Sequence, residues 1–370
     1  MTRTTRGVLA LAAAFAFLTS TGCAIPQPKA REEAARRWNL ARAQLKAKLA
    51  SEQFEAGNLR AAADELNEAC RLVPDHPDFV PLRARVLLAE GDIAHASALL
   101  EQTHLEGKPQ AEVAYLLGIV RQQQQRWDEA LLAFQRAVEL DDEEVTYVVA
   151  VAQAQLQLGQ PWPALQYLSA RATRFSYTNA FQAALAECHE QLGDWPAAIA
   201  AWRQVAGTPA ADTGLRERLA VALFRDRRHR EAIPVLLAVL TDPQAQPVAP
   251  IRLMLAECYL TDGRPDAARE HVETVLQRSP DNAAALRMLA RVSAAAEDYD
   301  GALRLARRAL AADGNDPLTL ELVTALAWRA GDSQLAASAA TRLEALDAGN
   351  PVAQHILRAS LPPLTKDSAP

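Results

Sequence analysis

The feature that most constrains this 370-residue chain is an alanine that recurs at a nearly fixed interval. Successive members of the series lie 34 residues apart, with a single interval of 36 where residues 241–248 lengthen a turn. The series consists of Ala62, Ala96, Ala130, Ala164, Ala198, Ala232, Ala268, Ala302 and Ala336. Such regularity indicates a repeat architecture, in which each unit packs mainly against its neighbours.

Each of these alanines belongs to a unit with helical apolar spacing, and residues 111–144 show it most clearly. With Ala111 as position 1, large apolar residues occupy positions 7, 17 and 24, and small residues occupy positions 8, 20 and 27. The pattern predicts two amphipathic helices whose axes approach to about 8–10 Å, because small side chains leave room where the helices cross. The same register divides the chain into nine units: 43–76, 77–110, 111–144, 145–178, 179–212, 213–246, 249–282, 283–316 and 317–350.

A glycine marks the turn inside most units. It stands at position 15 as Gly57, Gly91, Gly159, Gly193, Gly263 and Gly331. Glycine readily adopts the left-handed backbone conformation that ends a helix. The residue after it is Asn58, Asp92, Asp194 or Asp332 in four units. Side chains of this kind accept hydrogen bonds from the first turn of a helix, so we expect them to cap the second helix of the unit.

The interval, the small residues and the turn glycine together resemble the tetratricopeptide repeat. This resemblance implies an all-α, right-handed superhelical solenoid of antiparallel helix pairs over residues 43–350. It also implies a concave groove lined by positions 2, 5, 9, 12 and 13 of the first helices. Residues 351–360 are then expected to form a capping helix, and the proline-rich residues 361–370 a disordered tail.

Those positions give a mostly polar set of groove residues that varies from unit to unit. The candidates are Arg85, Tyr115, Gln122, Gln153, Glu187, Glu257, Arg287, Arg291 and Trp328. Because Glu187, Glu257 and Arg291 share position 9, a ligand along the groove would meet acidic groups before a basic one. A groove of this composition either holds a protein or peptide partner or is simply solvated, and the sequence leaves both interpretations open. The subclass that grips C-terminal carboxylates is not supported, because the first units lack its lysine and asparagine residues.

The first residues resemble a bacterial lipoprotein signal. Two arginines precede an apolar run over residues 8–18, which is too short to span a bilayer as a helix. Gly22 and Cys23 follow this run, although Ser20 stands where lipoproteins prefer leucine. The resemblance implies a signal peptide over residues 1–22 and lipidation of Cys23. An ordinary signal peptide or an uncleaved anchor is the alternative.

Residues 23–42 would then form the lipidated cysteine, a tether and a basic helical extension. Ala24, directly after the cysteine, favours the outer membrane in bacteria with two membranes. Lys29 to Lys48 contains seven basic and two acidic residues, a net charge of +5. This stretch is either a solvated extension or a helix that rests against anionic lipid headgroups.

Side-chain chemistry gives no sign of catalysis. The formal net charge of −6 argues against a nucleic-acid partner. The sequence has no glycine-rich phosphate loop and no His or Cys pair with metal-ligand spacing. Cys70, Cys188 and Cys258 are expected to be small buried residues rather than a disulfide framework. Since the repeats also leave no segment for a catalytic domain, we expect no enzyme activity, no cofactor and no metal.

Two charge clusters stand apart from the repeat pattern. Six arginines lie between Arg216 and Arg230, and four acidic residues occupy positions 141–144 of the chain. Either cluster can be a solvated turn, and the arginines can alternatively bind an anionic ligand.

The sequence therefore predicts a non-catalytic, membrane-anchored periplasmic scaffold that mediates protein–protein interaction in envelope assembly, secretion or export. The alternative function is an accessory protein that binds an exported polysaccharide directly in the groove. Arg287, Arg291 and Trp328 are the only indication of that alternative.

Overall fold

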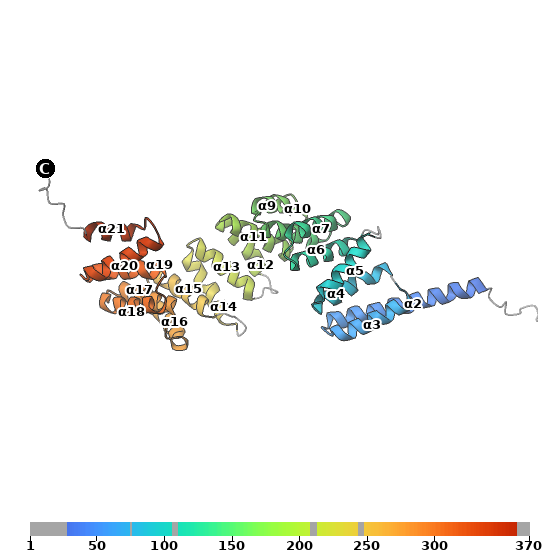
Figure 1. Ribbon diagram of the computed structural model, residues 1–370, viewed down its shortest axis with the longest axis horizontal. Helices are drawn as coiled ribbons and strands as arrows, with labels where there is room; N and C mark the ends of the chain where they lie inside the picture. Colours follow the sequence, from blue (N-terminus) through green and yellow to red (C-terminus); the bar gives the residue numbers. More distant parts are fainter. Residues whose placement is uncertain (1–27, 75, 106–109, 208–212, 243–247, 361–370) are drawn as a thin grey trace, which may run out of the picture. The chain divides into compact units, whose positions relative to one another are not determined.

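The computed structural model describes residues 28–360, except residues 75, 106–109, 208–212 and 243–247. The described residues form α-helices and one short 3-10 helix, and no strand (Figure 1). Contacts divide the chain between Leu158 and Gly159 into two compact units. The predicted all-α fold of consecutive antiparallel helix pairs is confirmed.

The first unit contains three helix pairs and a further helix. The pairs are α2 (Pro28–Glu55) with α3 (Leu59–Leu72), α4 (Val80–Ala89) with α5 (Ile93–Leu105), and α6 (Ala111–Gln123) with α7 (Trp127–Leu140). The 3-10 helix η1 (Pro77–Phe79) leads into α4, and α8 (Val145–Gln157) packs against α7.

The second unit begins with an irregular segment, because α9 (Pro161–Ser169) and α10 (Ala172–Phe175) are both short. Five pairs follow: α11 (Asn179–Leu192) with α12 (Trp195–Ala206), α13 (Thr213–Arg225) with α14 (His229–Leu240), α15 (Val248–Thr261) with α16 (Pro265–Arg278), α17 (Ala283–Ala295) with α18 (Tyr299–Ala312), and α19 (Pro317–Arg329) with α20 (Ser333–Leu346). The last helix, α21 (Pro351–Ser360), packs against α19 and α20 and buries Ala353 and Ile356.

Small residues lie at the helix crossings, as their spacing predicts. All nine alanines of the repeating series are fully buried. Position 8 is equally closed to solvent, and its one larger occupant, Thr324, donates its hydroxyl hydrogen to the carbonyl of Leu320 at 2.8 Å. A buried hydroxyl is tolerated there because its own helix satisfies it.

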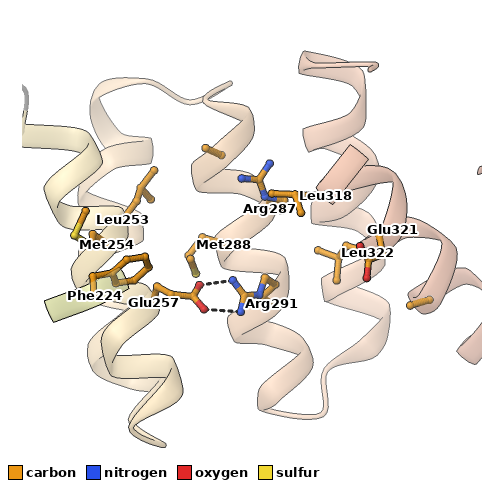
Figure 2. A pocket seen from close by; sticks show the side chains of 12 residues that line it. Phe224, Leu253, Met254, Glu257, Arg287, Met288, Arg291, Leu318, Glu321 and Leu322 are labelled. Carbon is orange, nitrogen blue, oxygen red and sulfur yellow. Dashed lines mark hydrogen bonds and ion pairs between the residues drawn. The ribbon is translucent and has the colours of Figure 1, made fainter. Parts of the chain in front are cut away.

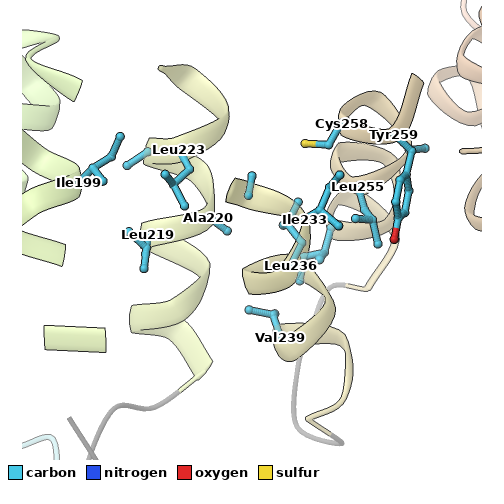
Figure 3. Close-up of a cluster of buried hydrophobic side chains, with 14 of the residues drawn as sticks. Ile199, Leu219, Ala220, Leu223, Ile233, Leu236, Val239, Leu255, Cys258 and Tyr259 are labelled. Carbon is cyan, nitrogen blue, oxygen red and sulfur yellow. The ribbon is translucent and has the colours of Figure 1, made fainter. Parts of the chain in front are cut away.

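Larger apolar side chains fill the space between these crossings. In the second unit, one continuous buried cluster joins side chains from four successive helices, Ile199 of α12, Leu223 of α13, Leu236 of α14 and Leu255 of α15 (Figure 3). Such a core has no centre, because each helix pair is stabilised mainly by the pairs before and after it.

The turn between the two helices of a repeat has the same left-handed backbone in all nine repeats. Every position-15 glycine has a positive φ, and so do the three residues that replace glycine there, Gln125, Arg227 and Glu297. The geometry of the helix pair therefore fixes a left-handed backbone at position 15 even where the residue has a Cβ atom.

Three of the four predicted helix caps form. Asp92, Asp194 and Asp332 each accept a hydrogen bond from the backbone N–H three residues later, at 3.1–3.3 Å. The prediction is wrong for Asn58, whose side-chain amide instead donates to Gln53 at 2.9 Å. That contact lies across the turn, so it competes with the cap for the same side chain.

The N-terminal part of α2 projects beyond the packed array. Residues 29–38 are all exposed, Trp38 by 66%, and the first buried residue of the helix is Ala43. The packed half is held to α3 by Lys46, which pairs with Glu65 and Glu68 at 2.7 and 2.8 Å. The basic segment is therefore a continuous extension of the first repeat helix.

Candidate functional site

Four first helices of the second unit, α13, α15, α17 and α19, line an open cavity of about 480 Å³ (Figure 2). We call this cavity the groove pocket. It is lined by Phe224, Leu253, Met254, Glu257, Ala284, Arg287, Met288, Arg291, Leu318, Glu321, Leu322 and Ala325. Helix–helix contacts link α15 to α17 and α17 to α19, which places these first helices next to one another.

The lining residues share a helix face. Almost all of them fall at positions 2, 5, 6 and 9 of their repeats, a spacing of three or four residues that keeps side chains on one side of a helix. Repetition at an interval of 34 then brings the same face of each successive first helix to the same side of the array.

Two of the charged pairs at the groove pocket are internal to the protein. Arg291 donates to both carboxylate oxygens of Glu257, through Nη2 to Oε1 at 2.8 Å and through Nη1 to Oε2. Arg287 pairs with Asp316, the N-cap residue of α19. Paired groups of this kind are less available to a ligand, since a new partner has to replace an existing one.

Glu321 differs from these groups because it forms no hydrogen bond or ion pair with any residue that the structure describes. It is half-buried and lies on α19 beside Leu318 and Leu322 (Figure 2). Leu318 is 60% exposed, so it adds apolar surface at the edge of the cavity that a bound molecule could cover. The groove pocket thus combines an apolar lining with one uncompensated carboxylate.

Three of the predicted groove residues, Glu257, Arg287 and Arg291, line this pocket. Trp328 lies on α19 and is 38% exposed, but it is not among the lining residues. The apolar residues at position 6, Met254, Met288 and Leu322, were missed. Their signal was present, since position 6 lies four residues after position 2 and so shares its face.

Glu187, a further candidate, is part of a network between α11, α12 and α13. Arg218 donates to Glu187 at 3.0 Å and to Glu190 at 2.9 Å, and the indole of Trp202 donates to Glu190 at 2.7 Å. Burial raises the pKa of Glu187, and the nearby Arg218 partly opposes this rise.

These pairs correct the expected series of charges along the groove. Glu187 and Glu257 do not present free carboxylates, and Arg291 does not present a free guanidinium group, because each is bound to a residue of a neighbouring repeat. Reversing Glu187 and Glu257 to lysine would place each new cation beside an arginine and destabilise the fold.

The candidates of the first unit lie in different surroundings. The guanidinium of Arg85 lies 4.8 Å from the ring centroid of Phe54. Tyr115 packs between Phe134 and Tyr147 at centroid distances of 5.6 and 5.0 Å, and its burial raises the pKa of the phenol. Gln122 and Gln153 are exposed.

Three of the six arginines in the cluster are paired with carboxylates. Arg218 binds Glu187 and Glu190, Arg228 binds Glu231 at 2.7 Å, and Arg230 binds Asp262 at 2.5 Å. In the acidic cluster, Asp141 accepts from the backbone N–H of Glu143. Glu144 caps α8 by accepting from the N–H of Thr146 at 3.0 Å. These three arginines and these two acidic residues therefore have structural roles in turns and between repeats.

The thiols of Cys188 and Cys258 are not activated. Burial raises the pKa of the thiols of Cys188 and Cys258 to about 12, so both remain protonated and poorly nucleophilic at neutral pH. Within the described ranges, no group of three or more His, Cys, Asp or Glu side chains is arranged to hold a metal ion.

The membrane-related predictions fall largely outside the structure. Residues 1–22, Cys23 and the tail 361–370 lie outside the described residues. None of the helices that the structure describes has the length and apolar character needed to cross a bilayer.

Serial helix pairs with small residues at their crossings and a groove along their first helices define a helical-repeat scaffold. Residues 260–326 match the family model described as the tetratricopeptide repeat. This match and the repeated helix pairs confirm the tetratricopeptide repeat that the sequence predicts. Residues 75–230 also match the model of the N-terminal domain of EccA1, an ESX-1 type VII secretion system protein.

Several solved structures are similar in fold. A tetratricopeptide repeat protein from Parabacteroides merdae is 12% identical, with a TM-score of 0.47 over 68% of this chain and 99% of that one. PilW, described as a type IV pilus biogenesis factor, is 17% identical, with a TM-score of 0.49 over 57% of this chain and 97% of its own. YrrB, described as having an unusual peptide-binding site, is 17% identical, with a TM-score of 0.46 over 51% and 96%. A comparison with curated proteins gave no match.

Proposed function

We propose that this protein is a non-catalytic scaffold of the bacterial cell envelope, lipid-anchored at Cys23 and facing the periplasm, that holds a protein segment in the groove pocket. The observation that carries the binding role is the groove pocket itself. It is continuous over four first helices, has a largely apolar lining and displays Leu318 to solvent at 60% exposure. Contiguous apolar surface at a concave site is typical of a surface that binds another molecule.

The anchoring role rests on the sequence. Gly22 and Cys23 follow an apolar run over residues 8–18, and α2 begins at Pro28 with a basic, exposed segment. Such a segment close to an acyl chain adds electrostatic attraction to a membrane that carries anionic lipid. An outer-membrane position is favoured by Ala24.

Direct binding of a polysaccharide receives no specific support. Its two arginines, Arg287 and Arg291, are already paired with Asp316 and Glu257, and Trp328 does not line the groove pocket. We therefore retain the protein-binding role.

Site-specific photo-crosslinking tests the binding surface. A photoreactive phenylalanine analogue at position 318 should give a discrete adduct with a partner in intact cells. The matched control is position 346 on α20, where Leu346 is also exposed, by 49%, but lies on a second helix. Adducts at position 346 with none at position 318 would show that the partner uses another surface.

The anchor is tested separately by cell fractionation. The Cys23→Ser variant should remain unprocessed or leave the outer-membrane fraction, because the acyl chains supply most of the membrane affinity. Normal processing and unchanged fractionation would exclude lipidation at Cys23.

A further inference from the structure

The groove pocket has a chemical preference that follows from which of its groups are already paired. Its apolar surface comes from Phe224 on α13, Leu253 and Met254 on α15, Met288 on α17, and Leu318 and Leu322 on α19. Two of these side chains are methionines, which adjust their shape to an inserted group more readily than branched residues do. An apolar side chain of a partner is therefore the natural occupant of the cavity.

The charges at the cavity restrict what can flank that side chain. Glu257 forms an ion pair with Arg291, and Arg287 forms one with Asp316. An acidic partner would have to displace one of these carboxylates before it could reach an arginine. A basic partner meets no such obstacle at Glu321, which has no ion pair or hydrogen bond among the described residues.

We propose that the groove pocket selects a partner segment that inserts an apolar side chain and places a Lys or Arg beside it, against Glu321. This inference rests on the proposed function, because it specifies the partner of the same groove. Charge complementarity carries it: Glu321 is the single uncompensated charge that the lining contributes, and burying it without a cation would cost free energy. The preference is opposite to that of a carboxylate-gripping site.

The sharpest test is an unbiased selection with the full chain purified in detergent. A random dodecapeptide library is panned against the wild type, against Glu321→Lys and against Glu273→Lys. Glu273 is an exposed carboxylate on α16, a second helix, and it does not line the cavity. The two variants therefore have the same net charge and differ in where the charge is reversed.

The expected result is a wild-type pool rich in an apolar residue close to Lys or Arg. The Glu273→Lys pool should be the same, whereas the Glu321→Lys pool should lose the basic residue and gain Asp or Glu. For one selected peptide, Glu321→Lys should weaken binding about fivefold, as expected for one partly solvated ion pair. Leu318→Ser should weaken binding of the same peptide about tenfold, because apolar contact is lost. The helical circular dichroism spectra of the Glu321→Lys and Leu318→Ser variants should match that of the wild type.

Three other outcomes each overturn a defined statement. A pool enriched in apolar residues alone would refute the role of Glu321 while leaving groove binding intact. A basic preference that survives Glu321→Lys would refute it in the same way. If none of the three proteins recovers more peptide than a surface without protein does, the groove is not a peptide-binding site. That result would refute the proposed function as well.

Discussion

A single residue in each repeat, at position 15, has a left-handed backbone, and its chemistry shows how strongly the fold dictates local conformation. Six of these residues are glycines, with φ between 71° and 80°. The other three are Gln125, Arg227 and Glu297, with φ of 59°, 59° and 63°. For a residue with a Cβ atom this conformation costs roughly 1–2 kcal/mol, so packing of the two helices must outweigh that cost.

Replacing one of these three residues by glycine should therefore stabilise the protein. Glu297 is exposed and its side chain forms no hydrogen bond or ion pair with the described residues, so Glu297→Gly mainly removes backbone strain. We expect a gain of about 0.5 kcal/mol, because the greater freedom of glycine in the unfolded chain offsets part of the relief. Urea denaturation followed by circular dichroism measures the change.

The control is the reverse change in the next repeat. Nothing lies within 4 Å of a Cβ built on Gly331, so Gly331→Ala adds strain without a steric clash. It should destabilise the protein by about 1 kcal/mol. If both substitutions lower stability, backbone strain at position 15 is not the controlling factor.

At the scale of helices, the sequence predicts where elements begin and end better than which charges meet. Turn glycines and small crossing residues act within one repeat, so their spacing was sufficient to predict the helix pairs. Ion pairs act between repeats. Glu257 and Arg291 occupy the same position of adjacent repeats, and the sequence shows this, but it does not show that the two side chains turn toward each other.

The short helices α9 and α10 could not be predicted from the sequence either. The repeat interval is unbroken there, so residues 145–178 were expected to contain two ordinary helices. The second is instead short and is followed by a four-residue helix, Ala172–Phe175. Phe175 is buried and packs against Phe181 of α11 at a centroid distance of 6.1 Å. A tertiary contact of this kind has no local signature.

One helix end should make stability depend on pH. Asp316 caps α19 by accepting from the backbone N–H of Thr319 at 3.1 Å, and it also pairs with Arg287. Burial alone would raise the pKa of this carboxyl, but the bonds from Thr319 and Arg287 outweigh it and lower the pKa. The ionised form is thus favoured in the folded state. Its contribution is present above the unfolded value near pH 4 and is lost as the pH falls through the lower folded value.

The variant Asp316→Asn keeps an acceptor for the cap but removes the charge. It should cost about 1.5 kcal/mol at pH 7, and the difference from the wild type should shrink toward zero on acidification below pH 4. Chemical denaturation at several pH values measures both effects. Asp266→Asn, in the exposed first turn of α16, should change stability by less than about 0.5 kcal/mol at any pH. A constant penalty for Asp316→Asn across the range would mean that its charge is not what stabilises the cap.

At the scale of the whole chain, stability should be local. The helices within each unit pack on their neighbours in sequence, and the contacts divide between Leu158 and Gly159. Repeat arrays of this kind behave as a sum of unit stabilities and nearest-neighbour interfaces. A defect in one repeat should therefore loosen the repeats beside it and leave distant repeats protected.

Gly118 offers a site at which to introduce such a defect. A Cβ atom added there would approach three ring carbons of Phe134 to under 3.0 Å, and that ring is fully enclosed in the core. Gly118→Ala should destabilise the first unit by about 1–3 kcal/mol, because the ring has no free volume into which to move. Hydrogen exchange read by mass spectrometry should then show faster exchange in α5 to α8 and unchanged exchange in α15 to α20.

Gly314→Ala is the matched control, since its Cβ would lie at ordinary contact distances of 3.5 and 3.8 Å from its nearest neighbours. It should leave exchange unchanged throughout. If Gly118→Ala instead accelerates exchange equally in both units, the chain unfolds as one cooperative body and the nearest-neighbour description does not hold for it.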